Sequence, residues 1–328
     1  MSNIEINNTE DFCSFYGHKS IESISLTNAF TDYMVELYDK INDSYQTRKV
    51  SSYNIESLIK QAKQFFSSMG YNIHNVGLLS DETIQKELIN KDIHSVNKLA
   101  DIYNSLPSMV SPFDIPIEGM NSHSFKGYTI AQLLSVDDPK FHQDILKRIN
   151  VYFDRIKISN NLNEITLNSY IHELTHTQTM SNKGIIEDMY NSEVLSIFNE
   201  LLFAYHKDIR LFYIYMNKTI NSLFQTFTRF YIDFKNGNYN TNKIYSVSFD
   251  THYDYRYLVS VLKAMNLLTI YINSNQKIRN EIIANINQVF DGDKTLETVL
   301  DHFDVSTESS IGNRKTLRLI NKFDKIKK

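Results

Sequence analysis

The sequence predicts a mainly α-helical protein of two lobes with a small β element. The chain has only 9 Gly and 4 Pro in 328 residues, which favours long helices over a turn-rich β protein. Apolar residues also recur at three- and four-residue spacing through much of the chain. All four prolines lie between Pro107 and Pro139, and this clustering predicts an N-terminal helical lobe, residues 1–106, followed by a second domain, residues 107–328.

The N-terminal lobe is expected to consist of helices. Residues 26–45 and 55–69 show helical periodicity, and Gly70 is suited to cap the second of these helices. Ser80 begins a further predicted helix, and Ser95 begins another that ends before Pro107. No group of residues in this lobe has catalytic spacing.

The β element is predicted around the middle of the chain. Short strands are expected at residues 113–117 and 128–134, followed by a short helix at 140–149. In the second half of residues 151–158, apolar and polar side chains alternate, which predicts a strand. A turn then leads into a helix that begins at Thr166. Further helices are expected at residues 185–208, 211–234 and 252–273, before a basic terminal segment.

Composition and charge exclude several classes of protein. A net charge of −4 argues against a nucleic-acid partner, and the single cysteine excludes an intramolecular disulfide and a Cys-rich metal site. No stretch approaches the roughly 20 apolar residues that span a bilayer, and the first residues lack the pattern of a secretory signal. We therefore expect a soluble cytoplasmic protein with no membrane partner. The sequence leaves the oligomeric state open.

The helix that begins at Thr166 carries the pattern H-E-x-x-H, formed by His172, Glu173 and His176. Residues i and i+4 lie on one face of a helix, so both imidazoles can reach a single metal ion. Zinc accepts two histidines and leaves room for a water molecule, from which a neighbouring carboxylate can take a proton. The five-residue pattern alone fits equally well a surface helix that carries His and Glu for solubility.

A tetrahedral site needs a third protein ligand. The metzincin pattern requires Gly and then His or Asp after the second histidine, but Thr179 and Asn182 occupy those positions. The other option is a glutamate on the next helix. Glu193 and Glu200 are both suitably distant, and Glu187 is a weaker candidate.

Glu193 and Glu200 lie two helical turns apart on one face of the predicted helix, with Ser196 between them. Carboxylates on a core-facing stripe are costly unless they are paired or bind a cation. Near a zinc ion, one can be a ligand and the other can orient a histidine. Without the two histidines, exposed charges on an amphipathic helix would be the simpler interpretation.

The stretch Glu193-Val-Leu-Ser-Ile-Phe-Asn-Glu200-Leu-Leu resembles the oligoendopeptidase F branch of the thimet oligopeptidase family, which are gluzincins. There a stretch like E-V-A-S-T-F-N-E-A-L follows H-E-x-G-H. The resemblance implies that His172, His176 and Glu193 bind one Zn²⁺, that Glu173 is the general base, and that Glu200 is an acidic partner behind the ligands. It also implies a helical two-lobed metallopeptidase fold with the β element beside the H-E-x-x-H helix.

Residues 249–257 are similar to the His- and Tyr-rich segment of the same family. The resemblance implies a catalytic phenol at Tyr255, which would donate a hydrogen bond to a developing oxyanion. It implies substrate binding by His252 and Tyr257, while leaving open which of Tyr253, Tyr255 and Tyr257 faces the metal. The similarity covers about residues 150–275, and Thr175 stands where the family usually has Gly.

The expected function is that of a zinc metallopeptidase, with endopeptidase action on short or unstructured peptides. A narrower version is a dedicated enzyme for one leader or signalling peptide. The strand at residues 151–158 would be an edge strand, which either holds an extended peptide beside the metal or is purely structural. The alternative function is a catalytically inactive peptide-binding protein on a metallopeptidase scaffold.

Overall fold

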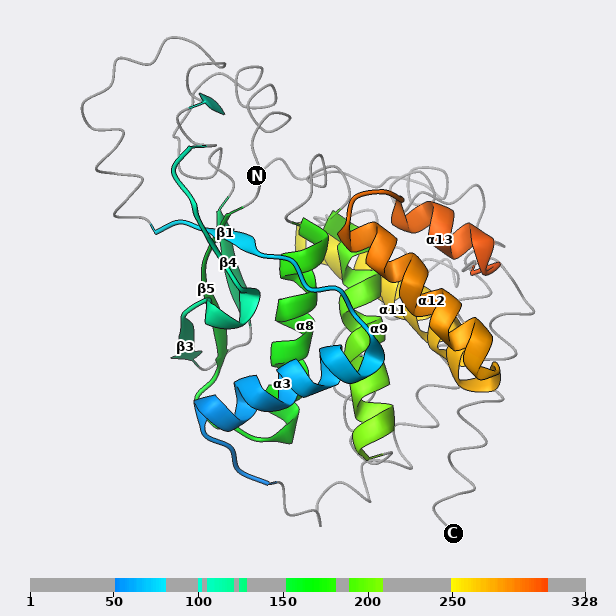
Figure 1. Cartoon of the computed structure of the whole chain (residues 1–328), viewed down its shortest axis with the longest axis horizontal. Coiled ribbons are helices and arrows are strands. Elements are labelled where there is room, and N and C mark those ends of the chain that lie inside the picture. Colours follow the sequence, from blue (N-terminus) through cyan, green and yellow to red (C-terminus); the bar gives the residue numbers. More distant parts are fainter. Residues whose placement is uncertain are drawn as a thin grey trace, which may run out of the picture. The chain divides into compact units, whose positions relative to one another are not determined.

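A computed structural model describes residues 51–80, 100–101, 105–120, 124–128, 152–180, 189–208 and 249–305 (Figure 1). The chain forms two compact units. The first unit combines Val50–Phe203 with Ser274–Val299. The second unit combines Met1–Lys49, Ala204–Asn273 and Leu300–Lys328. Within the described ranges, no helix is both long and apolar enough to cross a membrane.

A small mixed sheet is built around strand β5, Tyr152–Ser159. Its alternating pattern follows the expected period of two, with Asp154, Ile156 and Ile158 buried and the side chains between them partly exposed. Four shorter strands complete the sheet, namely β1 (Val76–Leu78), β2 (Ser108–Val110), β3 (Ile117–Met120) and β4 (Ser124–Tyr128).

Strand β5 is paired along both of its edges. Ile156 pairs with Ile117 of β3, in parallel, and with Phe125 of β4, antiparallel. Phe153 pairs in the same way with β1 and β4. The short strands β1 and β3 therefore follow each other along one edge of β5, and β4 occupies the opposite edge. The expectation that this segment is an edge strand is wrong, because its backbone groups already pair with three other strands.

The helices of the first unit are formed by segments that are distant in sequence. Helix α3 covers Ile55–Met69, as predicted, with Asn54 as N-cap and Gly70 as a left-handed C-cap at a φ of 80°. A 3₁₀ turn, η1, covers Pro112–Asp114. The remaining helices of this unit are α8 (Glu164–Met180), most of α9 (Met189–Lys207), α12 (Gln276–Phe290) and the start of α13 (Leu296–His302).

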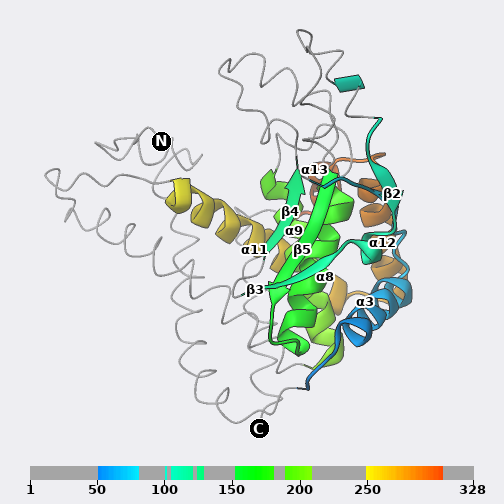
Figure 2. The ribbon, with the colours of Figure 1, turned by 90° about the vertical axis from the view of Figure 1, so that its left-hand side faces the viewer.

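Helix α8 lies at the centre of this unit and contacts β5, α3, α12 and η1 (Figures 1 and 2). Asn163 begins it by accepting hydrogen bonds from the backbone N–H groups of Ile165 and Thr166. Every side chain from Thr166 to Thr179 is buried, although ten of these fourteen residues are polar or charged. The interpretation of this stretch as a surface helix, polar for solubility, is therefore excluded.

The segment between α3 and β1 fastens the ends of three helices together. The side chain of Gln178, on α8, accepts a hydrogen bond from the backbone N–H of His74 and donates one to its carbonyl. Asn287, on α12, makes the same pair of bonds with the backbone of Asn72 and Gly70. The packing therefore joins α3 and β1 to the H-E-x-x-H helix across the boundary predicted at residue 106. Residues 1–50, 81–99 and 102–104 of the predicted N-terminal lobe lie outside the described residues.

Helix α11, Phe249–Asn273, belongs to the second unit. It includes the predicted helix at residues 252–273. In the same unit the ring of Tyr271 packs edge-on against His206 at the end of α9. The predicted helices at residues 26–45, 140–149 and 211–234 and the basic terminal segment lie outside the described residues.

The β element differs in detail from its prediction. Residues 113–117, predicted as a strand, contain η1 and only the first residue of β3. The strand expected at residues 128–134 shares only Tyr128 with β4, and residues 129–134 lie outside the described residues. Strands β1 and β2 are three residues long and were not predicted, because a three-residue strand is too short to show an alternating pattern. The mainly helical class is confirmed for the described residues.

Two glycines provide a test of this packing. One lies in β1 and the other in β3, the two strands that pair with the same edge of β5. A Cβ on Gly77 would lie 2.7 Å from Cδ1 of the buried Tyr152 ring, whereas a Cβ on Gly119 would meet the side-chain oxygen of Asn160, which is exposed and can rotate away. We expect Gly77→Ala to lower the free energy of unfolding by about 1–3 kcal/mol. Gly119→Ala should change it by less than about 0.5 kcal/mol. Urea unfolding measures both values, and a larger loss for Gly119→Ala would contradict the packing described for Tyr152.

Candidate metal centre

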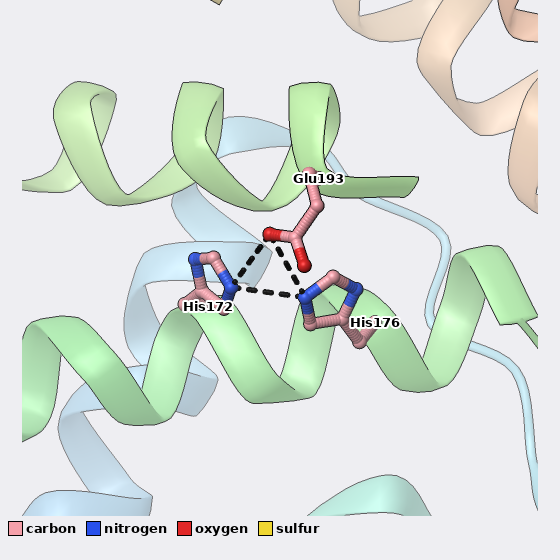
Figure 3. Close-up of side chains that lie close together, drawn as sticks. All are labelled: His172, His176 and Glu193. Atoms are coloured by element: carbon pink, nitrogen blue, oxygen red, sulfur yellow. Dashed lines mark hydrogen bonds and ion pairs between the residues drawn. The ribbon is translucent and has the colours of Figure 1, made fainter. Parts of the chain in front are cut away.

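Two histidines and a glutamate from two helices face one another in the first unit (Figure 3). His172 and His176 project from one face of α8, and Glu193 projects towards them from the first half of α9. The Nε2 atoms of the two histidines are 2.9 Å apart. Glu193 Oε2 lies 3.3 Å from His172 Nε2 and 3.4 Å from His176 Nε2. The three atoms thus form a nearly equilateral triangle.

This triangle has the dimensions of a metal site. A tetrahedral ion with bonds of about 2.0–2.1 Å holds its ligand atoms about 3.3 Å apart. Two observed separations match that value, and the third is a few tenths of an ångström shorter. Two ring nitrogens at 2.9 Å share a proton in a hydrogen bond, and metal binding displaces such a proton. The donor set, two imidazoles and one carboxylate, could hold a metal ion.

Glu200 lies behind the triangle and fixes the orientation of His172. Its Oε2 atom is 2.7 Å from His172 Nδ1, and both side chains are buried. A carboxylate accepts a hydrogen bond, so Nδ1 carries a proton and Nε2 is directed at the centre of the triangle. The two glutamates that the sequence left as alternatives therefore occupy different places. Glu193 faces both histidines, and Glu200 contacts only the far side of one of them.

The pKa values of the two histidines are shifted in opposite directions. Burial lowers the pKa of His172, but the charges and hydrogen bonds of Glu200 and Glu193 outweigh it and raise that pKa well above 6.5. Burial dominates at His176 and lowers its pKa. Burial disfavours the charge of Glu193, yet the two histidines hold its pKa below the ordinary range. Without a metal, the cluster is therefore stabilised by one buried cation between carboxylates.

Glu173 lies beside this cluster, and one of its carboxyl oxygens takes no part in the hydrogen bonds of the described residues. It is buried, and its Oε2 atom has no hydrogen-bond partner among the described residues. Burial raises the pKa of Glu173 to about 8, with His172 lowering it and the charges of Glu193 and Glu200 raising it. A divalent ion at the triangle would lower this pKa again, because positive charge stabilises the carboxylate. Glu173 can thus gain and lose a proton near neutral pH.

Other predicted site residues are not brought to this cluster by the described structure. Tyr255, His252 and Tyr257 lie in α11 of the second unit, and their side chains are outside the described parts. Their roles in catalysis and substrate binding stay predictions. Glu187, the weakest candidate for a ligand, falls in the interval 181–188, which the structure does not describe.

Sequence reasoning missed two residues near the site, Asn199 and Tyr71. The Asn199 side chain donates a hydrogen bond to Thr175 on α8 and accepts one from the hydroxyl of Tyr71. Asn199 carries one available signal, because an amide beside Glu200 on a core-facing stripe needs a polar partner. Tyr71 has no such signal, since its partner is 128 residues away in the sequence.

Comparison of the chain with protein-family models, with curated proteins and with solved structures finds no match. The assignment of a function therefore depends on the geometry and chemistry of the cluster.

We expect the purified chain, after incubation with a divalent transition metal and removal of the excess, to retain about one ion per chain. His176→Ala and Glu193→Ala should each reduce bound metal to the background level, because two remaining ligands hold an ion weakly. Elemental analysis by mass spectrometry measures the content. His74→Ala is the matched control, since the exposed side chain of His74 contacts Asp291 and only its backbone bonds to α8. Equal metal content in His176→Ala and His74→Ala would exclude the site.

Proposed function

We propose that the chain is a zinc-dependent peptidase. The observation that carries the proposal is the triangle of His172, His176 and Glu193, with Glu173 next to it on α8, whose buried Oε2 atom has no hydrogen-bond partner among the described residues. Two histidines and a glutamate are the ligand set of catalytic zinc sites that leave a coordination position open. A purely structural zinc site would be closed by a fourth protein ligand, and the described residues supply three.

Zinc fits the donors better than calcium or magnesium does. Imidazole nitrogen suits zinc, copper, iron and nickel, whereas calcium and magnesium prefer oxygen ligands. The separations near 3.3 Å agree with tetrahedral bonds of about 2.0–2.1 Å. When bound, zinc supplies Lewis acidity, which polarises a carbonyl group and makes a water molecule more acidic.

The residues of the chain would then perform the proton transfers. Glu173 takes a proton from the water whose oxygen attacks the carbonyl carbon of the peptide, and passes that proton to the amine as the C–N bond breaks. Burial raises the pKa of Glu173 to about 8 in the metal-free site, and a bound ion would lower it again, so that the carboxylate can take up the proton and return it. Glu200 keeps the His172 ring in the orientation that ligation requires.

The substrate class rests on the resemblance to the oligoendopeptidase F branch of the thimet oligopeptidase family. The resemblance favours a cytoplasmic enzyme that acts on short or unstructured peptides and cleaves them at internal peptide bonds. Tyr255 would donate a hydrogen bond to the carbonyl oxygen, with His252 and Tyr257 contacting the peptide. A single dedicated leader or signalling peptide is the narrower form of the same proposal.

Glu173→Gln tests the proposal. The amide has nearly the same shape but cannot accept and return a proton, so we expect peptide cleavage to fall by about 10²–10⁴-fold. Zinc content should stay at the level of the parent chain, because Glu173 is not one of the three ligands. Cleavage of a peptide library, followed by mass spectrometry, and elemental analysis give the two values.

The matched control is Glu297→Gln, which makes the same change on the exposed surface of α13 and should leave cleavage unchanged. If Glu173→Gln cleaves peptides as fast as the Glu297→Gln control, the assignment of Glu173 as the base is wrong. If the zinc-loaded parent cleaves no member of the library, the alternative of a non-catalytic peptide-binding protein is favoured.

A further inference from the structure

We infer that a buried chain of hydrogen bonds from Tyr71 through Asn199 to Thr175 positions the metal ligands, by fixing the register of α9 against α8. The inference rests on the proposed zinc site, but it concerns residues that do not bind the ion. Asn199 and Thr175 are fully buried, and Tyr71 is almost so. Together they link three segments of the first unit.

The direction of each hydrogen bond in this chain is determined by its groups. Asn199 Oδ1 can only accept, so the Tyr71 hydroxyl donates to it at 2.5 Å. The amide nitrogen of Asn199 then donates to Thr175 Oγ1 at 3.0 Å. The Thr175 hydroxyl donates in turn to the backbone carbonyl of Ile171 at 2.9 Å. Each side-chain oxygen thus has a partner, and reversing any bond would leave two donors or two acceptors facing each other.

This series of hydrogen bonds crosses from α8 to α9 directly beside the metal cluster. Thr175 immediately precedes His176 on α8, and Asn199 immediately precedes Glu200 on α9. If α9 slid or rotated against α8, Glu193 and Glu200 would move with Asn199. A change of register by one helical turn, about 5.4 Å, would separate the Asn199 amide from the Thr175 hydroxyl far beyond hydrogen-bonding distance. The bond therefore permits only the register in which Glu193 faces both histidines.

An apolar contact could not set the register in this way. Most of the buried α9 residues around Asn199 are apolar, among them Val194, Ile197, Phe198 and Leu201, while Ser196 and Glu200 are buried polar residues. Contacts among apolar side chains are non-directional, so neighbouring registers differ little in free energy. A buried amide that loses its partner costs about 1–3 kcal/mol, which disfavours the other registers. One polar pair within an apolar interface is a known means of specifying helix register.

Tyr71 attaches this series of hydrogen bonds to a segment outside the two helices. It follows the C-cap of α3, where its backbone N–H bonds to the carbonyl of Phe66. Its ring packs at centroid distances of 5.6 Å from Phe66 and 5.8 Å from Phe290, at the end of α12. The hydroxyl that Asn199 meets is thereby held by an aromatic cluster of α3 and α12. The register of α9 is thus set against the core of the unit as well as against α8.

The test compares Thr175→Val with Thr175→Ser. Valine has the shape of threonine without the hydroxyl, and serine restores the hydroxyl. We expect Thr175→Val to lower zinc affinity by about 10–100-fold, the usual effect of removing a partner outside the ligand set, and Thr175→Ser to keep the affinity of the parent. Competition with a chromophoric chelator measures affinity. The visible absorption of the Co²⁺-loaded proteins, which reports ligand geometry, should change in the valine variant and not in the serine variant.

Two further variants complete the design. Thr179→Val removes a buried hydroxyl from the same helix whose described hydrogen bonds all stay within α8, and it should bind zinc as the parent does. Tyr71→Phe removes the far end of the chain and should give a smaller loss of affinity with the same change in the Co²⁺ spectrum. If Thr175→Val does not fold, Tyr71→Phe decides the question by the same two readouts.

The outcomes separate this inference from the proposed function. A parent chain that binds neither Zn²⁺ nor Co²⁺ overturns the proposed function. A parent that binds both, together with folded Thr175→Val and Tyr71→Phe variants of unchanged affinity and spectrum, overturns the positioning role alone. Lower thermal stability of these variants with unchanged affinity and spectrum also overturns it, because the chain would then be structural only.

Discussion

The contact between α8 and α9 is the constraint on which the site depends. Each helix alone places its polar residues on one face, but neither helix alone forms a site. The Nδ1–carboxylate contact between His172 and Glu200 and the amide–hydroxyl contact between Asn199 and Thr175 cross this interface within one helical turn. Their burial makes them directional and costly to break, so they hold Glu193 opposite both histidines.

Burying the polar and charged groups of the site costs free energy of folding, and the surrounding structure offsets that cost. His172, Glu173, His176 and Glu200 are buried in the interior of one unit together with several amides and hydroxyls, and an unpaired charge there would cost several kcal/mol. The His172 cation between two carboxylates satisfies part of the cluster without a metal. Around it, the sheet, α3 and α12 cover α8 on its other faces, so that water is excluded from most of the cluster. Such an environment strengthens the electrostatic contacts that a metal ion would make.

The pairing of β5 along both edges changes the expected place of a peptide beside the metal. The segment that precedes α8 cannot accept a further strand, since β1 and β3 occupy one edge and β4 the other. Among the described strands, β4 is the outer one on that side of the sheet. A peptide that binds near Glu173 therefore has to be held by groups other than the backbone of β5.

The sequence by itself determined the helix with the two histidines, the number of residues from it to Glu193 and Glu200, and the C-cap of α3, because these depend on residues within a few turns of one another. Only the tertiary structure decided which glutamate faces the histidines, because residues two turns apart on one face are equivalent until the opposite helix is in place. It also decided that the H-E-x-x-H helix is buried on all sides, since its polar side chains find partners on α9 and in the segment after α3. The strands β1 and β2 and the hydrogen bond between Tyr71 and Asn199 depend on pairings across long stretches of sequence, which no local pattern encodes.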